Sequence, residues 1–305
     1  MSAPVEHIKA AMEIKHEVRA GLPARLAALA LRDGFALAGI AIYLFFIVIA
    51  LFADRIATQD PLEILFRSNG RVAANMQPGV SFLLGTTNLG RDVFSQLVYG
   101  ARSALIVGLS AAIVVVAIGT IVGLLAGYFG GWVDAILMRA GDIALAIPFL
   151  PFVIVLTAFL RPSTTNVIIA VAALLWANTA RVVRAQVLTV RERAYIEAAR
   201  VTGAGNARII FVHVAPNILP ISFLYGSIVV GWAIFAEATV SFIGLGPTDS
   251  VSWGFMLQDA FVSQALSRGS YYWFLPPGIC IMLIVSAGFF ISRGYEELLF
   301  PKLRD

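Results

Sequence analysis

The chain has 305 residues, of which 59% are hydrophobic and only 13% are charged, and its formal net charge at pH 7 is +4. Soluble domains carry about 25% charged residues, so this composition excludes an ordinary water-soluble protein and predicts an all-α protein embedded in membrane lipid. The arginines flank long apolar runs instead of forming one basic face, so the positive charge does not indicate a nucleic-acid partner. Cys280 is the only cysteine, which excludes an intramolecular disulfide and a cysteine-based metal site.

The N-terminal third of the chain predicts a tail, one transmembrane helix and a loop. Residues 1–34 mix basic and apolar side chains, which fits either a helix on a membrane surface or a loosely ordered cytoplasmic tail. The apolar run 35–53 is longer than the core of a secretory signal, and no clear A-x-A site follows it, so we expect an uncleaved first span. Residues 54–102 predict a periplasmic loop, with a short amphipathic helix that begins at Thr87 or Asn88.

Five further apolar runs predict a helical core at 103–293, because each is long enough to cross about 30 Å of hydrocarbon. The predicted spans are 103–129, 135–160, 167–188, 218–245 and 273–291. Residues 294–305 are predicted to form a short cytoplasmic tail. Six spans in total place both ends of the chain on the same side of the membrane.

Glycine and proline give the second and third predicted spans distinct features. Glycines recur every fourth residue at Gly119, Gly123, Gly127 and Gly131. Such a bare helix face lets another helix approach closely, which favours packing in lipid, although Gly127 and Gly131 fit the following turn equally well. In the third span, Pro148 and Pro151 predict a kink.

The distribution of lysine and arginine predicts the orientation of the chain. With the N-terminus in the cytoplasm, fifteen Lys and Arg residues fall on the cytoplasmic side and seven on the outer side. Cytoplasmic loops carry the excess of positive charge in membrane proteins, so both termini are expected in the cytoplasm. The loop at 190–216 is then cytoplasmic as well.

The stretch 190–216 is polar and amphipathic, although apolar spans flank it on both sides. Its first part contains Glu197, Ala198, Ala199 and Arg200. A short helix through these residues is expected to end at Gly203, because glycine suits the left-handed cap of a helix. A second helix is expected to start at Gly205 or Asn206 and to stop just before Pro216. The stretch therefore predicts a cytoplasmic helix–turn–helix.

The sequence lacks the motifs of several enzyme classes. None of its three lysines lies in the Gly-Lys-Ser or Gly-Lys-Thr of a Walker A loop, so the chain cannot hydrolyse ATP by that route. Neither HExxH nor Gly-x-Ser-x-Gly occurs. His213 lies near the predicted end of the second short helix, where a cation is favourable, and a structural or docking contact is expected there.

Two carboxylates inside predicted spans are candidates for the translocation path. Glu237 lies in the fifth span, where burial of an unpaired carboxylate is costly, so it is a candidate gate, path or proton-relay residue. A hydrogen-bonded structural role is the alternative for Glu237. Ser241 and Asp142 are the other path candidates, and an ion pair with Arg139 is the alternative role of Asp142.

The segment from Glu197 to Pro216 resembles the EAA loop of ABC importer permeases, in which Glu-Ala-Ala precedes a glycine. Further stretches resemble the C-type permeases of dipeptide and oligopeptide importers, a branch that includes nickel-transporting relatives. These stretches are Leu84 to Arg102 with Gly90, Arg91 and Asp92, the pair Asp142 and Pro148, Trp176 to Tyr195, Ala236 to Gly246, Ser252 to Gly254, and Trp273 with Pro276 to Gly278. The run Arg293 to Pro301 departs from the family pattern.

The resemblance implies a type I ABC importer permease fold with six transmembrane helices and cytoplasmic coupling helices in a bacterial inner membrane. It implies that residues 190–216 dock on a separate ATPase. The docking residues expected in this loop are Glu197, Ala198, Ala199, Arg200, Gly203, His213 and Pro216. The implied partners are a second homologous permease subunit, two ATP-binding subunits that hold ATP and Mg, and a periplasmic or membrane-anchored substrate-binding protein. The chain itself is expected to bind no cofactor or metal.

Peptides are the cargo that the resemblance implies, with nickel or another small solute as an alternative. A proton-coupled secondary transporter that uses Glu237 is an alternative from a different class, and it would need neither an ATPase nor a coupling loop. A non-transporting membrane scaffold is a third hypothesis, for which the sequence offers little.

Overall fold

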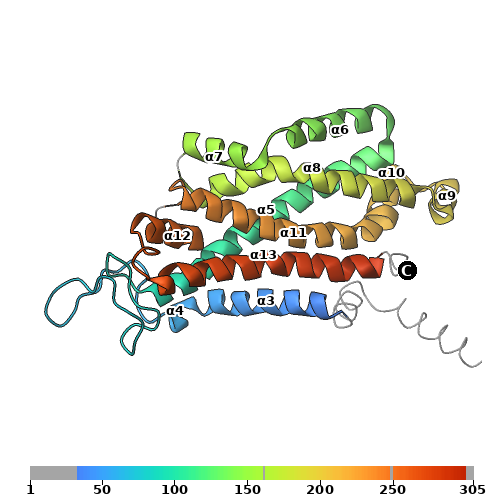
Figure 1. Ribbon diagram of the computed structural model, residues 1–305. Helices are drawn as coiled ribbons and strands as arrows, with labels where there is room; N and C mark the ends of the chain where they lie inside the picture. Colours follow the sequence, from blue (N-terminus) through green and yellow to red (C-terminus); the bar gives the residue numbers. More distant parts are fainter. Residues whose placement is uncertain (1–32, 161, 248–249, 300–305) are drawn as a thin grey trace, which may run out of the picture.

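The computed structural model describes residues 33–160, 162–247 and 250–299. Residues 1–32 of the tail predicted at 1–34 and residues 300–305 of the tail predicted at 294–305 lie outside the described residues, whereas 294–299 continue the last helix. The described part of the chain is a bundle of helices, joined by loops that contain two isolated β-bridges (Figure 1). In these described ranges, five helices are long and apolar enough to cross a membrane, or six if a bent pair of helices is counted as one span. The all-α membrane fold predicted from composition is therefore confirmed.

The first span, α3 (Gly34–Leu51), is followed by the short helix α4 (Ala53–Ile56). Asp33 caps α3, because its Oδ1 accepts a hydrogen bond from the Ala36 backbone N–H at 2.8 Å. α3 packs mainly against the last helix, α13 (Tyr271–Leu299), and the two lie side by side along the bundle (Figure 1).

Helix α5 (Val93–Phe129) corrects the prediction of a separate amphipathic helix before the second span. It begins after Asp92, which accepts hydrogen bonds from the Ser95 N–H and hydroxyl, and not at Thr87 or Asn88. Because no proline or turn interrupts it, the helix continues into the span and reaches about 55 Å in length. That exceeds the roughly 30 Å of a hydrocarbon core, so α5 extends beyond the membrane.

The third predicted span is two helices, α6 (Gly131–Ala146) and α7 (Phe149–Phe159), bent by 84°. The break falls at Ile147 and Pro148, both in extended conformation, because proline disfavours the helical conformation of the residue before it. Pro151 lies in the first turn of α7, where its missing N–H would have no partner within the helix. The predicted kink is therefore a complete break.

Gly119, Gly123 and Gly127 form the packing face predicted for α5, and their partner is α8 (Thr164–Arg191). A Cβ atom at Gly123 would lie 2.6 Å from the Ala180 carbonyl oxygen, so only glycine permits this approach of the two backbones. Gly131 does not belong to this face. It is the first residue of α6, with φ +51°, and no atom lies within 4 Å of a Cβ built there.

The chain after α8 forms α9 (Ala194–Val201), α10 (Asn206–Arg208), a π-helix η1 (Ile209–Val214) and α11 (Ala215–Phe242). The prediction that the second short helix ends before Pro216 is wrong. In the wider π-turn, the Ala215 N–H donates to the Ile210 carbonyl five residues back. A proline ring clashes with the carbonyl four residues before it in a regular α-helix, so the widened turn lets the helix pass through Pro216.

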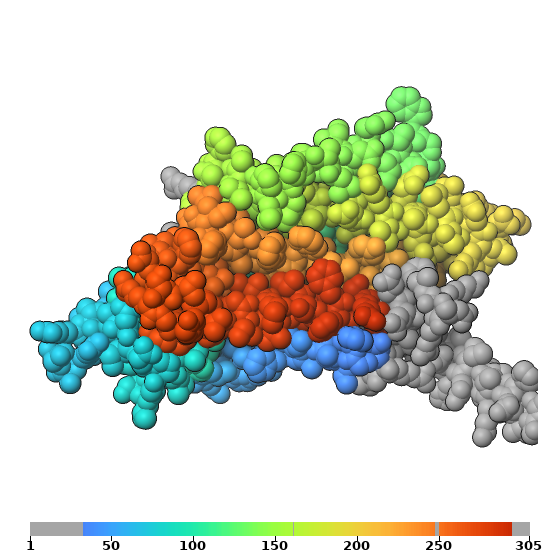
Figure 2. Space-filling view, in the orientation of Figure 1, coloured from blue at the N-terminus to red at the C-terminus, as the bar shows by residue number. Residues whose placement is uncertain are grey.

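The two ends of the bundle carry different structures. The loop between α4 and α5 and the short helix α12 (Trp253–Val262) lie at one end, while α9, the N-terminal end of α3 and the C-terminal end of α13 lie at the other (Figure 1). The space-filling view shows both loop regions projecting beyond the helices (Figure 2). Trp253 joins α12 to α5, since its indole N–H donates to the Leu97 carbonyl at 2.9 Å and its ring lies against Gly100.

Candidate functional site

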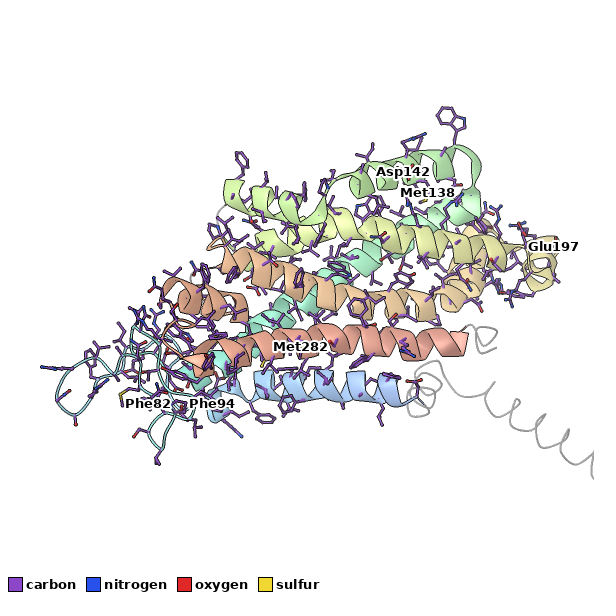
Figure 3. The ribbon with its side chains drawn as sticks, viewed as in Figure 1. Phe82, Phe94, Met138, Asp142, Glu197 and Met282 are labelled. Atoms are coloured by element: carbon purple, nitrogen blue, oxygen red, sulfur yellow. The ribbon has the colours of Figure 1, made fainter. Side chains whose placement is uncertain are left out.

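Residues 190–216, predicted to dock on an ATPase, are called the docking loop. Helix α9 exposes part of this loop at one end of the molecule. Glu197 lies near the tip of this projecting segment (Figure 3), and Glu197, Ala198 and Arg200 are all exposed, whereas Ala199 is half-buried. Ile196 is fully buried in a cluster with side chains of α5, α8 and η1. α9 is thus amphipathic, with one side fixed in the bundle and the other open to a partner.

Gly203 closes α9 in a left-handed cap, as predicted. Its φ is +84°, its N–H donates to the Arg200 carbonyl, and the Ala204 N–H donates to the Ala199 carbonyl, both at 3.0 Å. These two bonds are those of a Schellman motif. No atom lies within 4 Å of a Cβ built at Gly203, so the backbone angle alone, and not crowding, favours glycine here.

His213 and Pro216 lie where the loop returns to the bundle. His213 is half-buried in η1, and its carbonyl accepts a hydrogen bond from the Asn217 side-chain amide at 2.7 Å. Because the helix continues through Pro216, His213 does not lie at a helix C-terminus, and the dipole interaction expected for it is absent from this segment. The Asn217 amide also reaches the Tyr195 hydroxyl of α9 at 3.4 Å.

Two ion pairs join α6 to α8, and they correct the expected role of Asp142. Asp142 pairs with Arg181 at 2.6 Å, and Asp134 pairs with Arg184 at 2.5 Å. The predicted partner Arg139 lies on the same helix as Asp142, but the hydrogen-bonding cation comes from α8. These carboxylates form ion pairs between two helices and not within the surface of one helix.

A cavity of about 510 Å³ lies between α7, α8 and α11. Its lining includes Asn178 and Arg181 of α8 and the aromatic side chains Phe149 and Trp232, whose ring centroids lie 6.0 Å apart. Asn178 and Arg181 are exposed in the isolated chain. Polar side chains in a span seldom face lipid, so this side of α8 is suited to water, substrate or another protein.

Glu237 and Ser241 do not line this cavity. The Glu237 side chain is 2% exposed, and its Oε1 accepts a hydrogen bond from the Ser241 hydroxyl at 2.6 Å. Gly246 lies directly on Ser241, since a Cβ atom at Gly246 would overlap the serine side chain. Both candidates are therefore enclosed where α11 meets the segment that leads to α12. Asp142, in contrast, is hydrogen-bonded to Arg181, which lines the cavity.

Gly90, Arg91 and Asp92 form a structural junction at the N-terminal end of α5. Gly90 has φ +76°, and its carbonyl accepts a hydrogen bond from the Leu65 N–H at 3.0 Å. Asp92 is fully buried and also accepts from the Thr58 hydroxyl at 2.8 Å. Burial raises the pKa of the Asp259 carboxyl on α12, and the charge of Arg91 opposes that rise.

The sequence alone did not indicate two residues at the docking loop, Tyr128 of α5 and Val201 of α9. Tyr128, at the end of α5, donates a hydrogen bond to the Asn206 Oδ1 at 2.9 Å, and the Arg200 guanidinium lies 5.9 Å from the centre of its ring. Val201 is 88% exposed on the same side of α9 as Glu197. The position of Val201 four residues after Glu197 could have revealed it. Nothing local links Tyr128 to Asn206, which lies 78 residues later in the chain.

Comparison with known proteins identifies the family. Residues 119–305 match the family described as binding-protein-dependent transport system inner membrane component. The chain is 35% identical to the dipeptide transport system permease protein DppC of Alkalihalophilus pseudofirmus over 90% of this chain and 88% of that protein. It is 35% identical to the oligopeptide transport system permease protein OppC of Bacillus subtilis over 88% and 86% of the two chains.

A third relative is the di/tripeptide transport system permease protein DppC of Pseudomonas aeruginosa, which is 36% identical over 88% of this chain and 89% of that protein. The family match includes the glycine face of α5, the bent pair, the docking loop and the last two spans. The loop between α4 and α5 and the first span lie before the family match, and the alignments with these relatives extend over most of the chain. This chain belongs to the family of binding-protein-dependent transport system inner membrane components, and it is a multi-pass membrane protein of the type I ABC permease fold.

Proposed function

We propose that this chain is a permease subunit of an ATP-driven importer of di- and oligopeptides, and that it forms half of the translocation path. The observation that carries the proposal is the projecting α9, with an exposed Glu197 face and the Schellman cap at Gly203, on a chain of this family. The relatives named above are permeases of dipeptide, oligopeptide or di/tripeptide transport systems, which supports peptides over nickel as the cargo.

A member of this family works in a complex with ATPase and binding-protein partners. For this chain we propose a second homologous permease subunit, two ATP-binding subunits and a periplasmic or membrane-anchored substrate-binding protein. ATP and Mg would bind to the ATPase subunits, and this chain would bind neither. Both termini and α9 would lie in the cytoplasm, which agrees with the common end at which α9, the N-terminal end of α3 and the C-terminal end of α13 are found.

The proposed mechanism is alternating access driven through the docking loop. Closure of the ATPase dimer would move α9, and the buried Ile196 would carry this movement into the cluster formed by α5, α8 and η1. The cavity between α7, α8 and α11 would form this subunit's share of the path. Its exposed Asn178 and its aromatic walls can contact peptide amides and side chains alike.

A proton-coupled secondary transporter is less favoured, because such a protein needs no exposed docking loop. The buried contacts of Glu237 with Ser241 also fit a structural role better than a relay. Uptake that collapses with the proton gradient while ATP persists would favour this rival.

The test of the docking loop is Gly203→Asp in the reconstituted importer. Asp at φ +84° would distort the cap, so we expect peptide uptake and co-purification of the ATPase subunit to fall by more than about tenfold. Gly131→Asp is the matched control, because Gly131 is also exposed with positive φ but lies outside the docking loop. This variant should retain both peptide uptake and co-purification of the ATPase subunit.

A second variant, Ala198→Glu, tests the same surface without straining the backbone, since Ala198 is exposed within the helix. It should also weaken ATPase association through loss of close contact. Uptake and association that persist in both Gly203→Asp and Ala198→Glu would show that this loop does not dock the ATPase.

A further inference from the structure

The docking loop touches the end of α5 through the side chain of Tyr128. This residue is 7% exposed, and its ring belongs to the same buried cluster as Ile196. Its hydroxyl donates to the Asn206 Oδ1 at 2.9 Å, and its ring faces the Arg200 guanidinium at 5.9 Å. Arg200 precedes the turn at Gly203 and Asn206 follows it, so one tyrosine contacts both sides of the turn.

The other polar contacts of α9 in the described part of the chain lead elsewhere. Tyr195 contacts Asn217 on α11, which follows η1 directly in the chain. Arg191, at the end of α8, donates to the Gly127 carbonyl of α5 at 2.8 Å and fixes the residue next to Tyr128. Tyr128 therefore follows a residue whose carbonyl Arg191 holds, and among the described residues its side chain is the polar contact from α5 to both sides of the docking-loop turn.

Helix α5 is well placed to carry a displacement through the molecule. It packs against α8 along its glycine face and against α11, where the Thr120 hydroxyl donates to the Ser222 hydroxyl oxygen at 2.9 Å. Its other end is the Asp92 junction at the opposite end of the bundle. A push on its last turn would thus act on the whole length of an unbroken helix.

We propose that Tyr128 is a positioning residue that couples the docking loop to α5, so that movement of the loop by the ATPase becomes movement of the spans. This inference rests on the proposed function of the loop. Tyr128 would not contact the ATPase or the peptide; it would hold the turn between Arg200 and Asn206 at a fixed place on α5.

The test measures peptide uptake per ATP hydrolysed in proteoliposomes that contain the complete importer with its binding protein. Tyr128→Phe removes the hydrogen bond to Asn206 and keeps the ring over which Arg200 lies. Loss of one hydrogen bond changes an equilibrium by about fivefold, so we expect uptake per ATP to fall by about that factor while complex yield and basal ATPase activity persist. Tyr271→Phe is the control, because Tyr271 is an exposed tyrosine at the opposite end of the bundle.

Variants of the partner make the test specific to this contact. Asn206→Ala should reproduce Tyr128→Phe, and the double variant should be no worse than either single one, because both remove the same bond. Asn206→Asp should retain coupling, since its carboxylate accepts the tyrosine hydroxyl. Tyr128→Leu should lower uptake per ATP further than Tyr128→Phe, because it also removes the ring beneath Arg200.

Two results would overturn the proposal. In the first, Tyr128→Phe matches Tyr271→Phe in uptake per ATP; in the second, complex yield falls while uptake per ATP is unchanged, which is the result of a purely structural role. Gly203→Asp distinguishes this failure from failure of the proposed function. If Gly203→Asp abolishes ATPase association while Tyr128→Phe is silent, the loop docks the ATPase and Tyr128 does not couple it.

Discussion

Glu237 illustrates how the surroundings of one residue separate two functions. A carboxyl group in a span suggests proton or ion chemistry, but this side chain is 2% exposed and accepts a hydrogen bond from Ser241 on the next turn of its own helix. Ser252, which caps α12, lies close to the same carboxyl, and Gly254 packs onto the backbone of Ala238. The group is thus built into the joint between α11 and α12.

We expect Glu237→Gln to retain ATP-driven uptake, because the amide oxygen can still accept the Ser241 hydroxyl. Glu237→Leu should lower the stability of the purified subunit by roughly 1–3 kcal/mol, since it leaves a buried hydroxyl without its acceptor. Thermal unfolding in detergent and peptide uptake measure the two effects. Loss of uptake in Glu237→Gln at unchanged stability would instead indicate that the ionisable proton is needed.

At the scale of elements, the contact between α5 and α8 determines the core of the bundle. Gly119, Gly123 and Gly127 bring the α5 backbone against the side chains and carbonyls of α8, and two ion pairs then attach α6 to the other side of α8. In lipid, apolar side chains gain little by meeting each other, so close packing and paired charges supply the specificity. α8 is held on two sides and leaves the side with Asn178 free for the cavity.

Gly123→Ala should destabilise the subunit by about 1–3 kcal/mol, because the added methyl group would lie 2.6 Å from the Ala180 carbonyl and force the helices apart. The matched control is Gly278→Ala in α13, where no atom lies within 4 Å of the added group and alanine favours the helix by up to about 1 kcal/mol. Thermal unfolding in detergent compares the two variants. Equal unfolding temperatures would show that α5 and α8 can separate without cost.

At the scale of the whole molecule, the two ends differ in how they meet their surroundings. One end has the loop of residues 57–92, where Val80 is fully exposed, and the other has α9 with Val201 exposed (Figure 2). An importer needs this polarity, because its binding protein and its ATPase approach from opposite sides of the membrane. The proposed orientation assigns Val80 to the outside and Val201 to the cytoplasm.

The single native cysteine makes this orientation simple to test. In a Cys280→Ala background, we expect Val80→Cys to react with a membrane-impermeant thiol reagent in cells whose outer membrane is permeabilised and whose inner membrane is intact. Val201→Cys should react only after the inner membrane is permeabilised. Cys280→Ala alone provides the background signal, and labelling in the reverse pattern would invert the proposed topology.

Local patterns were enough to predict the apolar spans and the first half of the docking loop, up to the cap at Gly203. Runs of apolar residues, the prolines at the break between α6 and α7, and Gly203 at its positive φ act through their immediate neighbours, and their effect is visible in the sequence. The continuation of the helix through Pro216 was missed, because a widened turn upstream relieves a clash that proline causes in a regular helix.

By itself, the sequence determined that this is an importer permease of the type I ABC fold, with a polar loop between the predicted fourth and fifth spans. Only the tertiary structure decided that Asp142 pairs with Arg181, that Tyr128 meets Asn206, and that Glu237 is enclosed beside α12. The physical reason is that these spans are apolar on all sides, so hydrophobic periodicity cannot tell which face packs inward. Contacts between residues far apart in the chain follow from how the helices pack against each other, which local patterns do not specify.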